Sequence, residues 1–480
     1  LLKAQELSEY TNDEQTLAQL SDVVLLPEEE QVLEAYSTRS QANQNIQACQ
    51  AVDCDELANV TSERDEQAIE YQLAVEVLEN TNLGQNSGIP GRDTNFSDKV
   101  QAIIATQPGT VVIYPLVLED KLWLLWATEN GFDTQQIEDF SREGLTQTVT
   151  NFRSSVENRY SSIEALQADA EQLYNWLIEP VEKSLGEEEA LHHLVLSLDF
   201  STRYLPIGAL HDGEKYLIEK YDITTILSAS LTNIQERSPV GTENVSLLAI
   251  GTSQGFENFK ALPFVPIELD SIVKEQNNAA DTVGVYPGQQ LLDQSFTLES
   301  LQNSLLDKQF LHIATHGEFV SGSRYESYLL MGDGEKLLIP EISQLGSALK
   351  GIHLAVLSAC QTGLGGADEE GLEVAGLGYY FFQNEVDAVT ASLWNVSDSS
   401  TSQLMQRFYQ NLSVGTVAEP VTKAEALQQA QLAMLRSNDL ETDDNERFVL
   451  SPQNGDEVRP EIGLAHPYYW APFILIGNGL

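Results

Sequence analysis

The sequence predicts an α/β fold with a mostly parallel sheet covered by helices on both faces. From Val245 onward, short apolar runs alternate with helical stretches, as in such folds. Two of these runs, FLHIATHGEF (310–319) and IHLAVLSACQTGLG (352–365), turn polar and glycine-rich at their ends, which is typical of buried parallel strands. Chemistry in these sheets lies where strands end. His316 and Cys360, at the ends of the two runs, are therefore the candidate base and nucleophile.

Composition limits the classes of protein that fit. A length of 480 residues predicts two or three domains, and an apolar content of 42% is that of a globular protein. Asp and Glu outnumber Lys and Arg by 73 to 25, for a net charge of −48. This balance disfavours binding to nucleic acid or to an anionic membrane surface, because both need basic patches. An acidic docking face, high solubility and adaptation to a saline milieu each account for the charge.

Cysteine usage leaves the compartment open between cytoplasmic and exported. Cys49 and Cys54 lie close together in the acidic N-terminal region. A disulfide between them needs a turn and indicates an oxidising compartment, whereas two unpaired thiols fit a reducing cytosol. No apolar run is long enough to span a bilayer, and the start lacks a signal peptide, although a first residue of Leu makes that absence uninformative. No CxxC or HExxH spacing indicates a metal, and we expect no cofactor.

Residues 1–95 are predicted to form an acidic helical segment and a linker. The clearest helix covers 62–80, with Ser62 as its cap and Ile69, Leu73 and Val77 at helical spacing. The segment 82–93 is rich in Gly, Asn and Pro and reads as the linker. These helices are a candidate surface for a regulatory protein partner.

A second region begins near Thr110 with two apolar runs, 110–119 and 121–129, which predict a strand pair. A long helical stretch follows, and then a strand at 191–199. The core stripe of the helical stretch is predicted to be Leu173, Trp176 and Leu177. His192, His193 and His211 are irregularly spaced, which favours surface or capping roles over a metal site.

The remaining chain predicts the alternating elements of the main sheet. Besides the runs that end at His316 and Cys360, strands are expected at 245–251, 282–286, 327–332, 387–396 and 466–477. Helices are expected at 263–275, 295–307, 372–385, 399–412 and 423–436, with a long polar loop at 437–462. Asp398 or Ser399 is expected to cap the helix at 399–412.

The pair of strand-end residues suits acyl-transfer chemistry. A thiolate attacks a carbonyl well when a base such as His accepts its proton, and Gly317 beside the base is able to present a backbone N–H to the oxyanion. Taken singly, Cys360 fits a small buried hydrophobe and His316 a capping residue. Two further histidines are less suitable: His312 lies deeper in the strand and is predicted to be structural, and His353 opens its strand at the wrong end.

Here the sequence resembles a known family, the CHAT domain, a bacterial relative of caspases and separases. The motifs that carry the resemblance are RYLPIGALHDGEKYLIEKY, LHIATHGEF, LAVLSACQTGLG, EGLEVAGLGYYFF, AVTASLWNVSD, AEALQQAQLAMLR and HPYYWAPFILIG. They run from about residue 96 to the C-terminus and are most similar to cyanobacterial examples. The resemblance implies a degenerate caspase-like lobe at 96–240 and a catalytic caspase-like lobe at 241–480.

The same resemblance implies a clan CD cysteine endopeptidase that cleaves a specific protein partner. It implies His316 and Cys360 as the dyad and the backbone of Gly317 and Cys360 as oxyanion donors. The alternative function is a catalytically silent or latent scaffold or sensor that binds a protein partner.

The resemblance also points to a substrate-binding wall at Trp394 and Asp398. Separases read roughly W-D-V-T-D-x-D-I-D here and use a late acid to bind a basic P1 residue. This chain has WNVSDSSTS (394–402), with Ser400 and Ser402 at the later acidic positions. Asp398 is thus a candidate for one substrate-binding charge as well as for the helix cap.

Three adjacent acids, Asp368, Glu369 and Glu370, follow the nucleophile in the loop GGADEEGLE (365–373). They fit a solvated activation loop best; calcium binding or contact with a basic substrate segment are alternatives.

Overall fold

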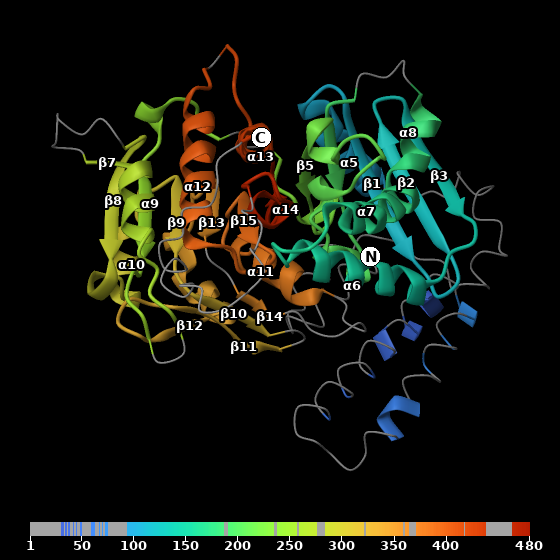
Figure 1. The fold of residues 1–480 in the computed structure, drawn as a ribbon, viewed down its shortest axis with the longest axis horizontal. Coiled ribbons are helices and arrows are strands. Elements are labelled where there is room, and N and C mark those ends of the chain that lie inside the picture. The colour runs from blue at the N-terminus through green and yellow to red at the C-terminus, as the bar shows by residue number, and fades with distance from the viewer. Residues whose placement is uncertain are drawn as a thin grey trace, which may run out of the picture.

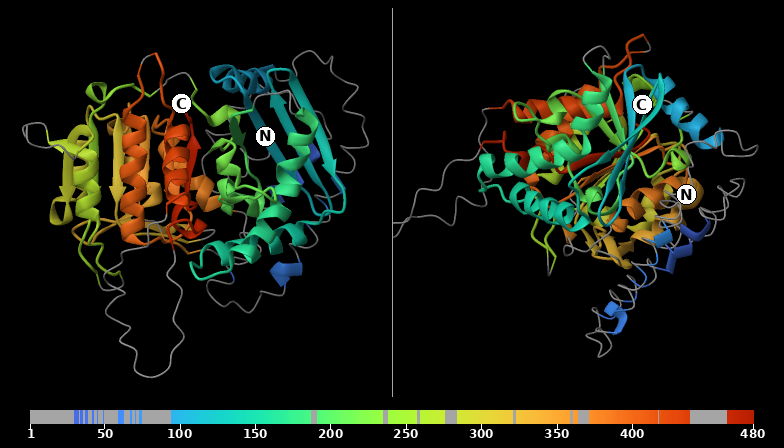
Figure 2. Two further views of the ribbon diagram at one scale, coloured as in Figure 1. Left: turned by 45° about the horizontal axis from the view of Figure 1, so that its top comes forward. Right: turned by 90° about the vertical axis from the view of Figure 1, so that its right-hand side faces the viewer.

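A twelve-stranded sheet runs through the whole molecule (Figures 1 and 2). The computed structural model describes residues 94–186, 191–234, 238–256, 259–275, 284–320, 323–358, 361–363, 371–416, 418–437 and 463–480, with isolated helical residues between 30 and 74. Eight of the eleven neighbouring strand pairs are parallel, which confirms the predicted α/β class. In spatial order the strands are β3 (Gly131–Ile137), β2 (Leu122–Thr128), β1 (Thr110–Val117), β4 (His193–Leu196), β5 (Asp222–Thr225), β16 (Phe473–Gly477), β15 (Ala388–Ser392), β13 (Leu354–Ser358), β9 (Phe310–Ala314), β6 (Leu247–Gly251), β8 (Tyr286–Leu292) and β7 (Val273–Glu275).

Helices cover both faces of this sheet because its central strands are apolar on both sides. In β13, Leu354 and Val356 face one buried cluster, while Ala355 and Leu357 face the other. The first face packs against α6 (Arg142–Val156), α7 (Ile163–Leu177), α8 (Glu179–Leu185), α9 (Val265–Ile272), α12 (Asp398–Ser413), α13 (Lys423–Leu435) and α14 (Pro467–Trp470). The second packs against α5 (Thr94–Thr106), α10 (Leu298–Ser304), α11 (Leu372–Phe382) and the 3-10 segment Ile339–Ala348. No helix in the described ranges is long and apolar enough to cross a membrane.

A small second sheet lies at the carboxyl ends of β9 and β13 (Figure 1). Its order is β12 (Lys336–Leu338), β11 (Ser323–Leu330), β10 (Gly317–Val320) and β14 (Gln361–Gly363). Strand β10 follows β9 along the chain, and β14 follows β13. The two runs singled out in the sequence therefore leave the main sheet side by side and pair again, in parallel, in the small one.

Several boundaries differ from the predictions. The strand expected at 282–286 begins only at Tyr286 and continues through Pro287 and Gly288, residue types that are uncommon inside strands. Gly288 is needed because β8 approaches β6 closely: a Cβ there would lie 2.1 Å from the Leu247 carbonyl oxygen. The polar strand β3 was missed because its exposed side chains give no apolar pattern.

The strand expected at 466–477 was wrong at its start. Residues Pro467–Trp470 form the short helix α14, since Pro467 suits a first helical position and His466 caps it. In the N-terminal segment, Ser62 lies within helical residues 59–62 rather than before them, and Leu73 is 55% exposed. The predicted linker at 82–93 and, apart from Ser437, the predicted loop at 437–462 lie outside the described residues.

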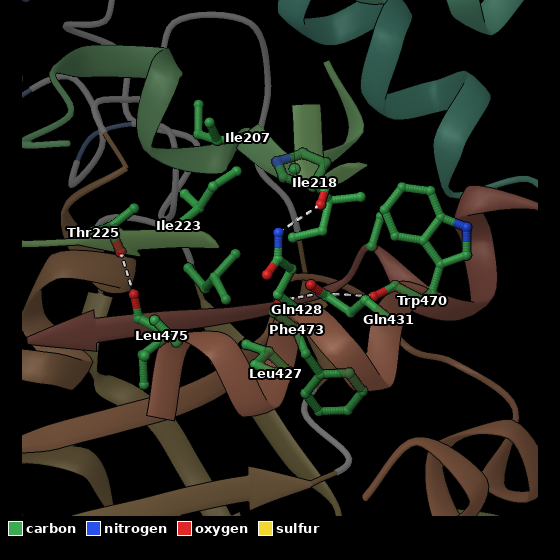
Figure 3. Close-up of a pocket in the computed structure, with 15 residues that line it drawn as sticks. Ile207, Ile218, Ile223, Thr225, Leu427, Gln428, Gln431, Trp470, Phe473 and Leu475 are labelled. Carbon is green, nitrogen blue, oxygen red and sulfur yellow. Dashed lines mark hydrogen bonds between the residues drawn. The ribbon is translucent and has the colours of Figure 1, made fainter. Parts of the chain in front are cut away.

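The two halves of the sheet join where β5 pairs with β16 (Figure 3). The Thr225 hydroxyl donates to the Leu475 carbonyl at 3.0 Å. From α13, the Gln428 amide donates to the Ile218 carbonyl at 3.0 Å, and the Gln431 amide to the Trp470 carbonyl at 2.9 Å. The cavity among these residues is about 30 Å3, room for little more than a water molecule. This region is therefore a packed joint between the halves.

Candidate active site

His316 lies between β9 and β10, at the carboxyl end of the main sheet. Backbone hydrogen bonds fix the chain on both sides of it. The Thr315 N–H donates to the Ser358 carbonyl at 3.2 Å, and the His316 carbonyl accepts the Leu330 N–H at 2.8 Å. The position of His316 is thus set by the ends of β13 and β11.

The imidazole of His316 is buried and oriented by the loop that precedes α9. Its Nε2 lies 2.8 Å from the Lys260 carbonyl oxygen, and its ring stacks on Phe259 with centroids 4.7 Å apart. A carbonyl only accepts, so Nε2 carries the proton of this bond. In the neutral ring Nδ1 is then the basic nitrogen.

Burial lowers the pKa of His316 below its usual value, while the hydrogen bond to the Lys260 carbonyl acts in the opposite direction. The ring is consequently neutral at pH 7. A neutral imidazole with one nitrogen already donating is the state that accepts a proton from a nucleophile.

Cys360 itself lies outside the described residues, but the residues around it are placed. In the main sheet Ser358 pairs with Ala314, and in the small sheet Gln361 pairs with Glu318. The described neighbours of Cys360 on both sides are therefore paired with residues two positions before and after His316.

Gly317, the predicted oxyanion donor, directly follows His316 and opens β10, where it pairs with Leu329. In the chain it lies between His316 and Glu318, and Glu318 pairs with Gln361 of β14. The second predicted donor, the N–H of Cys360, is outside the described residues.

The predicted substrate wall has structural partners. Trp394 is only 3% exposed, and its indole N–H donates to the Tyr468 carbonyl at 3.1 Å. Asp398 accepts the Phe264 N–H at 2.7 Å and is the first residue of α12. The predicted cap at Asp398 or Ser399 was wrong, because Asp398 already lies inside the helix and Ser397 takes the cap position.

The CHAT domain model matches residues 167–478. The chain belongs to the CHAT domain family. The motif resemblance was expected from about residue 96, upstream of where the family model begins. No curated protein matches the chain.

Two solved structures illustrate what this CHAT chain is similar to. The separase–securin complex of Saccharomyces cerevisiae matches at 10% identity and a TM-score of 0.49, over 99% of this chain and 36% of that one. The Arg-specific cysteine proteinase gingipain R matches at 11% identity and a TM-score of 0.35, over 70% of this chain and 74% of that one. The CHAT chain thus spans about a third of the separase chain.

Sequence reasoning missed three residues around the site of this CHAT protein. Lys260 acts through its backbone carbonyl, which no side-chain pattern reveals. Phe259 stacks on His316 from an irregular loop. Glu268 had a signal, since it falls among the buried positions Val265, Leu269 and Ile272 of α9, where an acid is rare.

The other histidines have structural partners. His312 is fully buried between Glu268, 2.8 Å from its Nε2, and Tyr409, 3.2 Å from its Nδ1, which confirms its predicted structural role. His353 lies at the opposite, amino end of β13, with Nδ1 2.6 Å from Asp387. Of the predicted surface or capping histidines, His192 is exposed, and His211 is buried but accepts the Gly213 N–H at 3.1 Å, as a capping residue does. His193 is buried and pairs with Asp222 instead.

Within the described ranges, no group of three or more His, Cys, Asp or Glu side chains is arranged to hold a metal ion. The acidic residues Asp368, Glu369 and Glu370 fall outside those ranges. Cys49 is disulfide-bonded and buried, and Cys54 is also outside the described residues.

Proposed function

We propose that this CHAT protein is a cysteine endopeptidase that cleaves a specific protein partner, with Cys360 as nucleophile and His316 as base. The observation that carries the proposal is the hydrogen bond from His316 Nε2 to the Lys260 carbonyl. It leaves Nδ1 as the basic nitrogen of a neutral ring, next to the strands that lead into and out of Cys360. The described residues on either side of Cys360, Ser358 and Gln361, pair with Ala314 and Glu318, which lie two positions before and after His316.

In the proposed reaction the Cys360 sulfur forms a bond to the scissile carbonyl carbon while its proton passes to His316 Nδ1. The N–H groups of Gly317 and Cys360 would stabilise the resulting oxyanion. Collapse of the intermediate breaks the C–N bond, and the amine leaves with the proton from His316. Water, deprotonated by the same imidazole, then hydrolyses the thioester and restores the thiol.

Trp394 and Asp398 enter the proposal as the wall of the substrate site. Asp398 also holds the Phe264 N–H, so two contributions have to be separated. If its charge binds a basic P1 residue, Asp398→Asn lowers cleavage after Arg or Lys only. If it chiefly anchors the loop before α9, the same change lowers cleavage at every site.

The test is cleavage-site profiling of a denatured proteome and a peptide library by wild type, Cys360→Ala and His316→Ala. We expect a defined set of cleavages in wild type that both variants lack. Identical, empty profiles for all three proteins, with and without added cell extract, would contradict the peptidase and favour the scaffold or sensor function.

A regulatory protein partner on the N-terminal segment 1–95 is part of the same proposal, supported by its acidic composition, with Lys3, Arg39 and Arg64 as the only bases in the first eighty residues. The partner surface would be basic, because opposite charges steer association. Cys360→Ala protein, which would bind without cleaving, serves as bait. Capture that is unaffected by high salt or by deletion of residues 1–95 would rule this surface out.

A further inference from the structure

A buried polar cluster connects β9 and β13, the strands that precede His316 and Cys360 in the chain. Glu268 Oε1 accepts the Ser358 hydroxyl at 2.6 Å and lies 2.8 Å from His312 Nε2. His312 Nδ1 in turn lies 3.2 Å from the Tyr409 hydroxyl. None of the four residues is more than 2% exposed. Because Glu268 Oε1 is the acceptor in this cluster, His312 donates through Nε2 and accepts from Tyr409 through Nδ1. Burial and the Glu268 charge raise the pKa of Tyr409 well above its usual value, so its hydroxyl keeps the proton that it donates.

The cluster connects the two strands that lead to the dyad. Ser358 is the last residue of β13 and precedes Cys360 by two positions. His312 is in β9 and precedes His316 by four positions. Strands β9 and β13 are neighbours in the main sheet, and Ala314 of β9 pairs directly with Ser358 of β13. A single carboxylate on α9 therefore contacts both strands close to their carboxyl ends.

The loop before α9 reaches the other side of the site. It supplies the Lys260 carbonyl and the Phe259 ring to His316. Five residues after Phe259, the Phe264 N–H is held by Asp398. Residues 259–268 are thus one continuous support that orients the base through the loop and holds the nucleophile strand through Glu268.

Stability alone does not account for a carboxylate in this place. Removing a charged side chain from water costs several kcal/mol, and apolar residues of similar volume often pack as well or better. What hydrogen bonds add is direction: the carboxylate fixes the angle and spacing of Ser358 and His312 in a way that apolar contacts do not.

We propose that Glu268 is a positioning residue, which fixes the ends of β13 and β9 through Ser358 and His312 and so sets the relative placement of Cys360 and His316. The proposal rests on the proposed peptidase function for its chemical consequence. Its structural consequence, fixed strand ends, is measurable without any activity.

The experiment uses acylation of Cys360 by p-nitrophenyl acetate, in which the thiolate displaces p-nitrophenolate and no protein substrate is needed. Glu268→Leu is expected to lower the acylation rate constant by about 100-fold at an unchanged half-saturating ester concentration, the loss typical of a misplacement of about 1 Å. Glu268→Gln, whose amide oxygen accepts both hydrogen bonds, should retain most of the rate. Ser271→Ala is the matched control. Ser271 is buried on the same helix, and its hydroxyl donates to the backbone carbonyl of Glu268 rather than to β9 or β13.

Hydrogen exchange of the amides at 312–318 and 354–358, followed by mass spectrometry, is measured on the same proteins. Faster exchange there in Glu268→Leu but not in Ser271→Ala supports positioning, even if the wild type proves inert to the ester and the peptidase proposal fails. Unchanged exchange would overturn it, and so would faster exchange with an unchanged acylation rate if the wild type does react with the ester. If Glu268→Leu does not fold, Ser358→Ala, which removes one hydrogen bond, gives the same two readouts with a smaller expected loss of about tenfold.

Discussion

The two halves of the sheet share a His–Asp pair at the amino ends of their strands. In the N-terminal half His193 pairs through Nδ1 with Asp222, directly across from it on the next parallel strand. In the C-terminal half His353 does the same with Asp387, in the matching register before β13 and β15. The sequences that follow are also alike, HLVLS at 193–197 and HLAVLS at 353–358.

The halves differ at the carboxyl ends of the same strands. After β4, Asp199 is buried and accepts the Val117 N–H at 3.1 Å, with Arg203 3.7 Å away. After β13 the chain continues through Cys360 into the small sheet beside His316. The carboxyl ends of these strands are therefore closed by structural bonds in the N-terminal half, whereas in the C-terminal half they carry the proposed base and thiol. Under the proposed function, chemistry depends on the residues at the strand ends rather than on the sheet.

The first test concerns the contact between the two halves of the sheet. His466, which caps α14 by accepting the Tyr468 N–H, also lies 3.3 Å from the Ser161 hydroxyl of the other half. Burial lowers its pKa to about 4, against the opposing hydrogen bond to Ser161. As pH falls from about 6.5 to 4, the unfolded chain binds a proton here that the folded chain does not. Folding stability should then fall by about 3 kcal/mol.

The check is urea unfolding of wild type and His466→Asn at pH 7 and pH 4.5. Asn retains a cap acceptor and does not titrate, so the variant should lose less stability in acid. His316, whose pKa is also lowered by burial, contributes a loss of the same sign in both proteins. An equal acid loss in the two proteins would mean that His466 is not the titrating joint.

A smaller effect tests the closed end of the N-terminal half. Asp199→Ala leaves the buried Val117 N–H without its acceptor, which should cost about 1–3 kcal/mol of folding free energy. Asp199→Asn keeps an acceptor oxygen and should cost less. Both are measured by urea unfolding, with Cys360 acylation as the second readout. If folded Asp199→Ala acylated Cys360 more slowly than wild type, the two strand ends would not be independent.

Much of the fold was predictable because it depends on apolar periodicity. The runs at 110–119, 121–129 and 387–396 coincide with β1, β2 and β15, and the runs at 310–319 and 352–365 contain β9 and β13, which are neighbours in the sheet. The polar strand β3 and the helix α14 were missed, since neither has the pattern of a buried strand.

The support of the site was less accessible to sequence reasoning. A backbone carbonyl such as that of Lys260 has no sequence signature, and its use by His316 follows only from how the loop folds. Glu268 and His312 lie 44 residues apart and on different elements, so their contact required the packing of α9 on β9. The sequence did show which residue types stand at the ends of the two apolar runs, a histidine at 316 and a cysteine at 360.

The proposed peptidase function depends most directly on His316 and Cys360 acting as one unit. The measurement is the rate of Cys360 acylation by p-nitrophenyl acetate from pH 5 to 8, with the modified cysteine located by mass spectrometry. We expect wild type to acylate Cys360 selectively, with a midpoint below pH 6.5 because burial lowers the pKa of His316. His316→Ala should lower the rate by about 100-fold or more, as for loss of a general base. An unchanged rate in His316→Ala, or acylation at residues other than Cys360, would contradict the dyad.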